Sequence, residues 1–251
     1  MAGQEGIIKL KGTLGGITFY KTRDGYLARE KGGIDRKRMA GDPAFKRTRE
    51  NGMEFGTAGR FGKHLRSAVR PLLQHTADKR VVSRLLKEMM RVLKTDVVNP
   101  RGERNPLDGE LQLLRGFEFN SGALLSNTLY APYTATLDRA SGNLSVSLPE
   151  LIPEQRIDAP AGTTHFKVVT AAAEVDFGQG NSAAVYNSTD EIPYDGTTVP
   201  EVTLDCEVTA GSALPLLHVL GVEFYQQING GFYMLNNGAF NALAVINIEK
   251  P

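Results

Sequence analysis

The sequence predicts an α+β protein in which an N-terminal β-hairpin and a basic helical region precede an antiparallel β-sandwich. Strand-forming segments joined by glycine turns fill the first thirty residues. Apolar residues then recur at helical spacing. Roughly seven or eight short strand-like segments with Gly, Pro and Asn turns follow, which is typical of a sandwich. We therefore expect a hairpin arm with a connector at 1–41, a basic helical hairpin at 42–105 and an acidic sandwich at 106–251.

The N-terminal arm is predicted to consist of strands. Ile7–Gly12, Ile17–Lys21 and Tyr26–Lys31 are strand-like, and Asp24-Gly25 is a strong hairpin signal. A tight hairpin turn requires positive φ, which glycine adopts at little cost. An isolated hairpin is only marginally stable in water, so we expect this arm to pack against another surface. Gly32–Gly41, with its glycines and charges, is expected to be a mobile connector.

Two helices are predicted in the basic region. Asp42 can cap the first helix, Pro43 fits its first position, and Pro71 is expected to end or kink it. Four glycines indicate either a break near Asn51-Gly52 or a face that another backbone approaches closely. These glycines are Gly52, Gly56, Gly59 and Gly62. The second helix, at about Asp78–Thr95, has a broad apolar stripe, and its Lys and Arg residues lie mainly elsewhere on its circumference.

The last part of the chain is predicted to be a sandwich of short strands. Two strands are expected around Arg139–Asn143, and an Asn-Gly-Gly turn at 229–231 joins another pair. In "EVTLDCEVTA" the apolar residues alternate, so Leu204 and Cys206 are expected to face inward. The segment "ALAVINIEK" is expected to close the chain as a buried strand. Residues 178–200 are polar and rich in Gly, Ser and Thr, so we expect a long exposed loop.

Charge is strongly segregated along the chain. Residues 1–105 hold 24 Lys or Arg against 11 Asp or Glu, whereas residues 106–251 hold 5 against 17. The segment Lys31–Glu50 alone has seven basic and three acidic residues. Such segregation indicates a surface that recognises a partner. Three interpretations remain open for the basic segment. It is a solvated face or pairs with this chain's own acidic part, it contacts another protein molecule, or it binds nucleic acid.

The sequence contains no recognisable catalytic motif. It lacks a phosphate-binding loop, a dinucleotide-binding glycine motif and a nucleophile elbow, so we expect neither enzymatic activity nor a cofactor. The four histidines lack metal-binding spacing, so packing or surface roles are expected, with a metal site formed through folding as the alternative. They are His64, His75, His165 and His218. Cys206 is expected to be a small buried hydrophobe rather than a nucleophile. Glu174 and Asp176 share a strand face, suited to acid–base work or a cation, or simply solvated.

The sequence also bears on compartment. The single cysteine excludes an intrachain disulfide, and the first residues lack the basic-then-apolar layout of a signal peptide. The longest nearly apolar run, near Ala213–Val222, is too short to span a bilayer. We therefore expect a cytoplasmic protein by default, with signal-independent release or assembly at the cell surface as the alternative.

These patterns favour a non-enzymatic structural protein that self-associates head-to-tail as a component of a filament, ring or particle. Its partners would be other copies, because a basic arm can dock on the acidic sandwich of a neighbour. The expected contact residues are Tyr20, Tyr26, Arg29, Arg36, Lys37, Arg38, Phe45, Arg47 and Arg49. The alternative is a nucleic-acid-associated protein that uses the basic region 29–94. A third class is a sandwich that binds carbohydrate or peptide through 178–200.

Three segments resemble the signature segments of a group of uncharacterised conserved bacterial proteins. They are "TFYKTRDGYLAREKGG", "DPAFKRTRENGMEFGTAGRFGKHLR" and "PAGTTHFKV". The resemblance covers most of the chain, is strongest over residues 13–75, and is most specific in "RTREN" (Arg47–Asn51). It implies no catalytic residue, cofactor or substrate, and it favours a structural or mobile-element role over metabolism.

Overall fold

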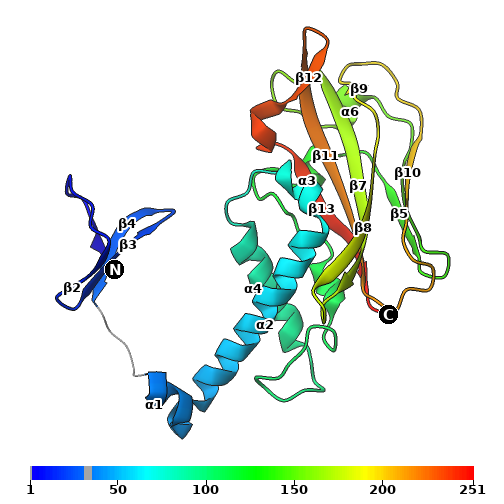
Figure 1. Ribbon diagram of the computed structural model, residues 1–251. Helices are drawn as coiled ribbons and strands as arrows, with labels where there is room; N and C mark the ends of the chain where they lie inside the picture. Colours follow the sequence, from blue (N-terminus) through cyan, green and yellow to red (C-terminus); the bar gives the residue numbers. More distant parts are fainter. Residues whose placement is uncertain (1, 31–35) are drawn as a thin grey trace. The chain divides into compact units, whose positions relative to one another are not determined.

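The computed structural model describes residues 2–30 and 36–251 and has the α+β class that the sequence predicts. The chain divides into two compact units, Met1–Arg49 and Glu50–Pro251 (Figure 1). The first unit holds a four-stranded antiparallel sheet and the start of the helical region, and the second holds two further antiparallel sheets. Of the predicted connector, residues 32–35 lie outside the described residues. Its remainder forms helix α1 (Arg36–Gly41), so a connector was the wrong prediction there.

The N-terminal sheet has the strand order β1-β4-β3-β2. Its strands are β1 (Ala2–Gly3), β2 (Gly12–Leu14), β3 (Ile17–Thr22) and β4 (Gly25–Glu30). The predicted hairpin is confirmed, since β3 pairs with β4 and Gly25 has a φ of 120°. The predicted strand Ile7–Gly12 is wrong except at Gly12, which begins β2; at Leu10 the backbone is bound by the Gln4 side chain instead of a strand. The Gln4 side chain accepts a hydrogen bond from the Leu10 amide at 2.8 Å and donates to the Leu10 carbonyl at 3.3 Å.

The helical region begins as its capping signal predicts, with the Asp42 carboxylate accepting a hydrogen bond from the Ala44 amide at 2.9 Å. The elements are η1 (Pro43–Phe45), α2 (Lys46–Ala68), α3 (Arg70–Gln74) and α4 (Val81–Lys94). Helix α2 runs without a break at Asn51-Gly52. Two of the glycines face α4, since a β-carbon would lie 3.5 Å from the Leu85 side chain at Gly62 and 3.9 Å from Leu86 at Gly59. A β-carbon at Gly52 or Gly56 would have no neighbour within 4 Å.

Two antiparallel sheets make up the rest of the second unit (Figure 1). The smaller sheet has the order β10-β6-β5 and comprises β5 (Thr134–Asp138), β6 (Asn143–Leu148) and β10 (Val202–Glu207). The larger comprises β7 (His165–Asp176), β8 (Asn181–Ser188), β9 (Ile192–Pro193), β11 (Leu216–Ile228), β12 (Gly231–Met234) and β13 (Ala242–Glu249). Short helical turns occur at η2 (Leu111–Leu114), α5 (Leu125–Thr128), α6 (Pro153–Arg156) and η3 (Leu235–Gly238).

The larger sheet has a hydrophobic core on each of its faces. On one face, residues such as Phe166, Leu220 and Phe224 pack against Val146 and Leu204 of the smaller sheet. On the other face, α2 and α4 cover the sheet, and their apolar residues join Val169, Val219 and Val245 in a single cluster. The Phe61 ring of α2 stacks on Phe177 at 4.4 Å between ring centroids. Helices α2 and α4 therefore share one hydrophobic core with the larger sheet, and the smaller sheet shares the other.

The segment 178–200 is not a long loop, as the composition predicted. It contains β8, which pairs with β7 from Val169↔Ser188 to Asp176↔Asn181, and the short strand β9. Most β8 side chains are exposed, so this edge strand depends on backbone hydrogen bonds and shows no apolar alternation. Among the described residues, no helix combines the length and the apolar character needed to cross a membrane.

Candidate docking surface

The N-terminal sheet has no hydrophobic core. None of the side chains described at 2–30 and 37–49 is buried, whereas the buried apolar clusters of the protein lie between Ala58 and Ile248. Ile7, Ile8 and Leu14 are among its most exposed apolar residues. A small sheet is stable in water when it packs an apolar face against another element. The N-terminal sheet therefore has apolar side chains that its own unit leaves uncovered.

The strand register separates the sheet into two unlike faces, because successive side chains of a strand point to opposite sides. Five of the residues on one face are Leu14, Ile17, Phe19, Tyr26 and Ala28, with the charged Lys21 and Glu30 at its ends, and we call this the apolar face. A cavity of about 450 Å³ beside Ile17 and Ala28 hollows the sheet at this side. The apolar face is the part of the sheet that gains most from being covered.

The opposite face carries polar and cationic side chains and is called the cationic face. Thr13, Thr18, Tyr20 and Leu27 lie there with one strand cation, Arg29, whose guanidinium is 5.5 Å from the centroid of the Tyr20 ring. Of the residues predicted from sequence, the structure thus brings Tyr20 and Arg29 together. It places Tyr26 on the apolar face, where Lys21 lies 5.4 Å from the ring centroid.

The remaining predicted contact residues surround η1. Arg38 lies 5.9 Å from the Phe45 ring centroid and 3.3 Å from the Asp42 carboxylate. Arg49 donates hydrogen bonds to the carbonyl oxygens of Met39 and Asp42 at 2.8 and 2.9 Å, so it holds the end of α1 in place.

Three more of the contact residues predicted from the sequence lie on α1 and α2. Lys37 is on α1 and Arg47 on α2, and each already takes part in an interaction. Arg36 begins α1, and its side chain lies outside the described residues.

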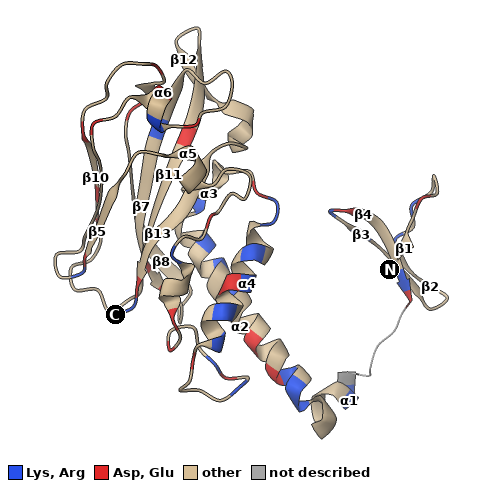
Figure 2. Cartoon of the chain, turned by 180° about the vertical axis from the view of Figure 1, so that it is seen from behind, with Lys and Arg blue, Asp and Glu red and all other residues tan. Residues whose placement is uncertain are grey.

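An acidic surface complements these cations on the smaller sheet of the second unit. The register places Asp138, Asp205 and Glu207 on its outer face, among Thr and Ser side chains, and we call this the acidic face. All three carboxylate residues are exposed, and the strands β5, β6 and β10 contain no Lys or Arg. Figure 2 shows the acidic residues along this side of the molecule, whereas basic residues gather on α2 and α4. Strand β5 forms an edge, since among the described strands it pairs with β6 alone.

A second polar cluster was missed by sequence reasoning because its members lie far apart in the chain. The Glu223 carboxylate, 4% exposed, is 2.8 Å from Nδ1 of His75 and accepts a 2.5 Å hydrogen bond from Tyr225. Burial and the neighbouring carboxylate raise the pKa of Tyr225 above its usual range. The cluster lines a cavity of about 350 Å³ with Ser188. Carboxylate binding orients the His75 ring, which leaves Nε2 as its second polar atom.

The other candidate residues named from the sequence are buried or form hydrogen bonds within the fold. Cys206 is buried on β10, as predicted. Glu174 is also buried and accepts a hydrogen bond from Thr209 at 2.8 Å, so a solvated carboxylate was the wrong prediction. Asp176 caps the turn that follows β7 through the amides of 178 and 179, both at 2.9 Å. Within residues 2–30 and 36–251, no group of three potential metal ligands comes together.

His218 is buried between the two sheets and gives the protein a predicted pH dependence. Its Nε2 is 3.1 Å from the Thr170 hydroxyl, Nδ1 has no partner among the described residues, and burial lowers the pKa to about 4. The neutral ring is therefore favoured in the folded state. The contribution of the neutral ring to stability is complete above the pKa of histidine in the unfolded chain, about 6.5. It is lost as the pH falls from there towards 4. The loss amounts to about 3 kcal/mol in the free energy of unfolding.

Urea unfolding at pH 7.5, 5.5 and 4.5 measures this effect as the difference between the wild type and His218→Gln. The difference is required because burial raises the pKa of Glu118 to about 6, which adds stability as the pH falls. We expect the wild type to lose more stability than His218→Gln towards pH 4.5. Parallel curves for the two proteins would contradict the assignment.

Comparison with known proteins adds little to this geometry. No protein-family model matches the chain, and no curated protein sequence matches it. Among solved structures, similarity was found to a chain from a structure titled "pH-induced modulation of Streptococcus parasanguinis adhesion by Fap1 fimbriae". The alignment covers 45% of this chain and 78% of that chain at 14% identity, with a TM-score of 0.22. A similarity at that score carries no argument about function.

Proposed function

We propose that this protein is a non-enzymatic structural protein that self-associates head-to-tail. The N-terminal sheet of one copy adds to the β5 edge of the next, so that a contact between unlike surfaces repeats along an assembly. The observation that carries the proposal is the sheet without a core: it has an apolar face and two open edges, and it buries no described side chain. Covering that face provides the driving force for association.

The two faces of the N-terminal sheet match those of the smaller sheet that would receive it. If β2 pairs with β5, one arrangement continues the apolar face into the inner side of β5, where Ala135 and Leu137 are half-buried. The same arrangement continues the cationic face into the acidic face. Residues 1–49 contain 12 Lys or Arg against 5 Asp or Glu, so the arm is attracted to an acidic surface before backbone pairing begins.

Charge reversal on either surface tests the proposal. The arm variant combines Arg29→Glu with Lys11→Glu, a change at the exposed lysine that directly precedes β2. The face variant combines Asp205→Lys with Glu207→Lys. The control reverses Arg60 and Lys63, two exposed residues of α2. Light scattering should show that the average mass of the wild type rises with concentration and falls with salt. Each test variant should associate about tenfold more weakly or worse, whereas the control should match the wild type.

A chain that carries both reversals distinguishes a specific contact from general repulsion. Because the reversed charges again face opposite charges, the combined variant should recover association. A wild type that stays monomeric at every concentration and salt would contradict the proposal, as would a control that dissociates as readily as the test variants.

A further inference from the structure

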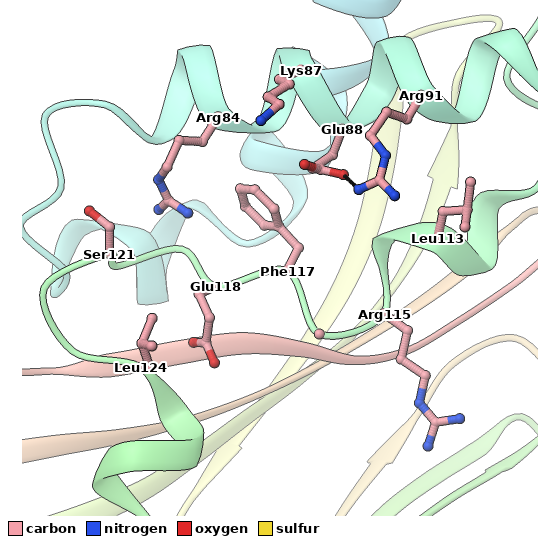
Figure 3. A pocket seen from close by; sticks show the side chains of 11 residues that line it. Arg84, Lys87, Glu88, Arg91, Leu113, Arg115, Phe117, Glu118, Ser121 and Leu124 are labelled. Atoms are coloured by element: carbon pink, nitrogen blue, oxygen red, sulfur yellow. Dashed lines mark hydrogen bonds and ion pairs between the residues drawn. The ribbon is translucent and has the colours of Figure 1, made fainter.

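A second surface of the protein is a basic cavity of about 430 Å³ in the second unit. It lies between α4 and the segment that follows η2 (Figure 3). Arg84, Lys87 and Arg91 line it from α4, at spacings of three and four residues that place them on one side of the helix. Figure 3 shows Arg84 and Lys87 extending towards the opposite wall, which carries Phe117. Phe117 itself is 7% exposed, and Leu113 and Leu124 are the more exposed apolar residues of the lining. The cavity therefore combines a row of cations with an apolar wall.

Arg84 is held in position before any ligand arrives. Its Nη2 atom is 2.6 Å from the Asp78 carboxylate, and its guanidinium lies 5.2 Å from the centroid of the Phe117 ring. Burial opposes ionisation of Asp78, but hydrogen bonds from Arg80, Ser121 and Arg84 still lower its pKa to about 2. Nε of Arg84 is buried and has no hydrogen-bond partner among the described residues. This donor is closed to a ligand, but the Arg84 side chain is 30% exposed where it lines the cavity. A fixed, partly exposed guanidinium suits recognition of an oxyanion.

The cavity has more positive charge than its carboxylates neutralise. Lys87 makes no hydrogen bond or ion pair with any described residue, and Arg91 is paired with Glu88 at 2.6 Å. The other acidic group, Glu118, binds the Leu125 amide through both carboxylate oxygens at 3.1 Å. It faces away from the cations of α4 in Figure 3. An uncompensated ammonium beside a preorganised guanidinium favours a ligand with more than one negative charge.

We propose that this cavity binds a small organic phosphate. Its phosphate oxygens contact Arg84 and Lys87, with Arg91 as a third cation, and its organic part packs on Leu113 and Leu124. The volume suits a ligand the size of a mononucleotide, since small-molecule sites commonly measure about 300 to 1,000 Å³. This site is independent of the proposed self-association, because none of its residues belongs to the N-terminal sheet or the acidic face.

Calorimetric titration of the full chain with a mononucleotide tests the proposal. Lys87→Gln removes an exposed cation, and Arg84→Lys keeps the charge but removes the planar donor set. The matched control is Lys94→Gln, which removes an exposed cation of the same helix that does not line the cavity. We expect saturable binding that weakens about tenfold or more in both test variants and less than about twofold in the control.

Two further ligands show which part of the phosphate compound is recognised. Inorganic phosphate should bind more weakly than the mononucleotide because it has no organic part to pack on the apolar wall. Equal affinity would overturn the role of the apolar wall. A single-stranded oligonucleotide that binds far more tightly, with steep salt dependence and equal loss in Lys94→Gln, would overturn the proposal in favour of a nucleic-acid surface. Absence of mononucleotide binding at millimolar concentration would also overturn it.

Discussion

Replacing Gly238 with alanine is expected to be among the most destabilising single changes in this protein, at about 3 to 5 kcal/mol in the free energy of unfolding. Gly238 is the last residue of η3 and has a φ of 78°, and a β-carbon there would overlap the backbone carbonyl oxygen of His75. That carbonyl also accepts a hydrogen bond from the buried Asn241 side chain at 2.9 Å, so it cannot move aside freely. Backbone strain and steric overlap therefore add.

Gly211→Ala is the matched control, because it introduces backbone strain without steric overlap. Gly211 has a φ of 64° and no atom within 4 Å of the position that a β-carbon would take. The cost of left-handed φ alone is about 1 to 2 kcal/mol. Urea unfolding should therefore separate the two variants by at least about 2 kcal/mol. Equal losses in Gly238→Ala and Gly211→Ala would show that the approach of His75 is not rigid.

The change at Gly238 should also disturb the cluster around Glu223. Displacement of His75 would remove one of the two hydrogen-bond partners of a buried carboxylate, and such a group is costly when it is left unpaired. The His75 ring resonances in an NMR spectrum should shift in Gly238→Ala and stay unchanged in Gly211→Ala. The turn between η3 and β13 thus positions the histidine.

Replacing Arg139 with alanine is the second change for which we expect a large loss, about 3 to 5 kcal/mol. The Arg139 guanidinium donates to the carbonyl oxygens of Ser212, Leu214, Glu249 and Lys250 at 2.7 to 3.2 Å, and to the Glu249 carboxylate at 3.2 Å. One side chain therefore joins the β5–β6 turn to the loop before β11 and to the end of β13. Its removal leaves several carbonyl groups without a partner.

Arg139→Lys serves as the control for charge. Lysine keeps the positive charge but not the planar set of five donors, so it should recover less than half of the lost stability. Thermal unfolding followed by circular dichroism measures both variants. Full recovery by lysine would mean that the ion pair with Glu249, rather than the carbonyl contacts, provides the stability. Since Arg139 follows β5 directly, Arg139→Ala should also weaken self-association under conditions in which the protein remains folded.

The two proposed surfaces have different salt dependences, which helps to separate them in experiments. Self-association depends on attraction between exposed charges and on burial of the apolar face, so salt should weaken it only in part. Phosphate binding depends on cations partly enclosed by Phe117 and Leu113 and involves one molecule of protein. A ligand titration at a protein concentration below the onset of association therefore reports on the cavity alone.

Local sequence patterns were sufficient for the elements that neighbouring residues determine. Asp42 followed by Pro43 identifies a helix start, and Asp24-Gly25 identifies a hairpin, because the backbone preferences and hydrogen bonds involved span only a few residues. The alternation around Leu204 and Cys206 predicts a half-buried strand because β10 has one face in the core. These signals need no knowledge of what lies across the core.

Two mistaken predictions came from elements whose stability depends on partners elsewhere. Composition indicated a loop at 178–200, but β8 is formed by backbone pairing with β7, to which polar side chains are no obstacle. Ile7–Gly12 has the composition of a strand, but of its residues only Gly12 pairs with a described strand, and the Gln4 side chain binds Leu10 instead. Strand-forming residues therefore do not form a strand where no neighbouring strand is available for backbone pairing.

The sequence by itself determined the α+β class, most element types and the segregation of charge, because these follow from local backbone preferences and from the order of residues. Only the tertiary structure decided that Tyr20 and Tyr26 lie on opposite faces of one sheet, and that Glu223 meets His75 across 148 positions. It also decided that α4 and Phe117 enclose a basic cavity. Such sites depend on packing between distant segments, and the free energy of that packing comes from burying the whole core rather than from any short stretch of chain.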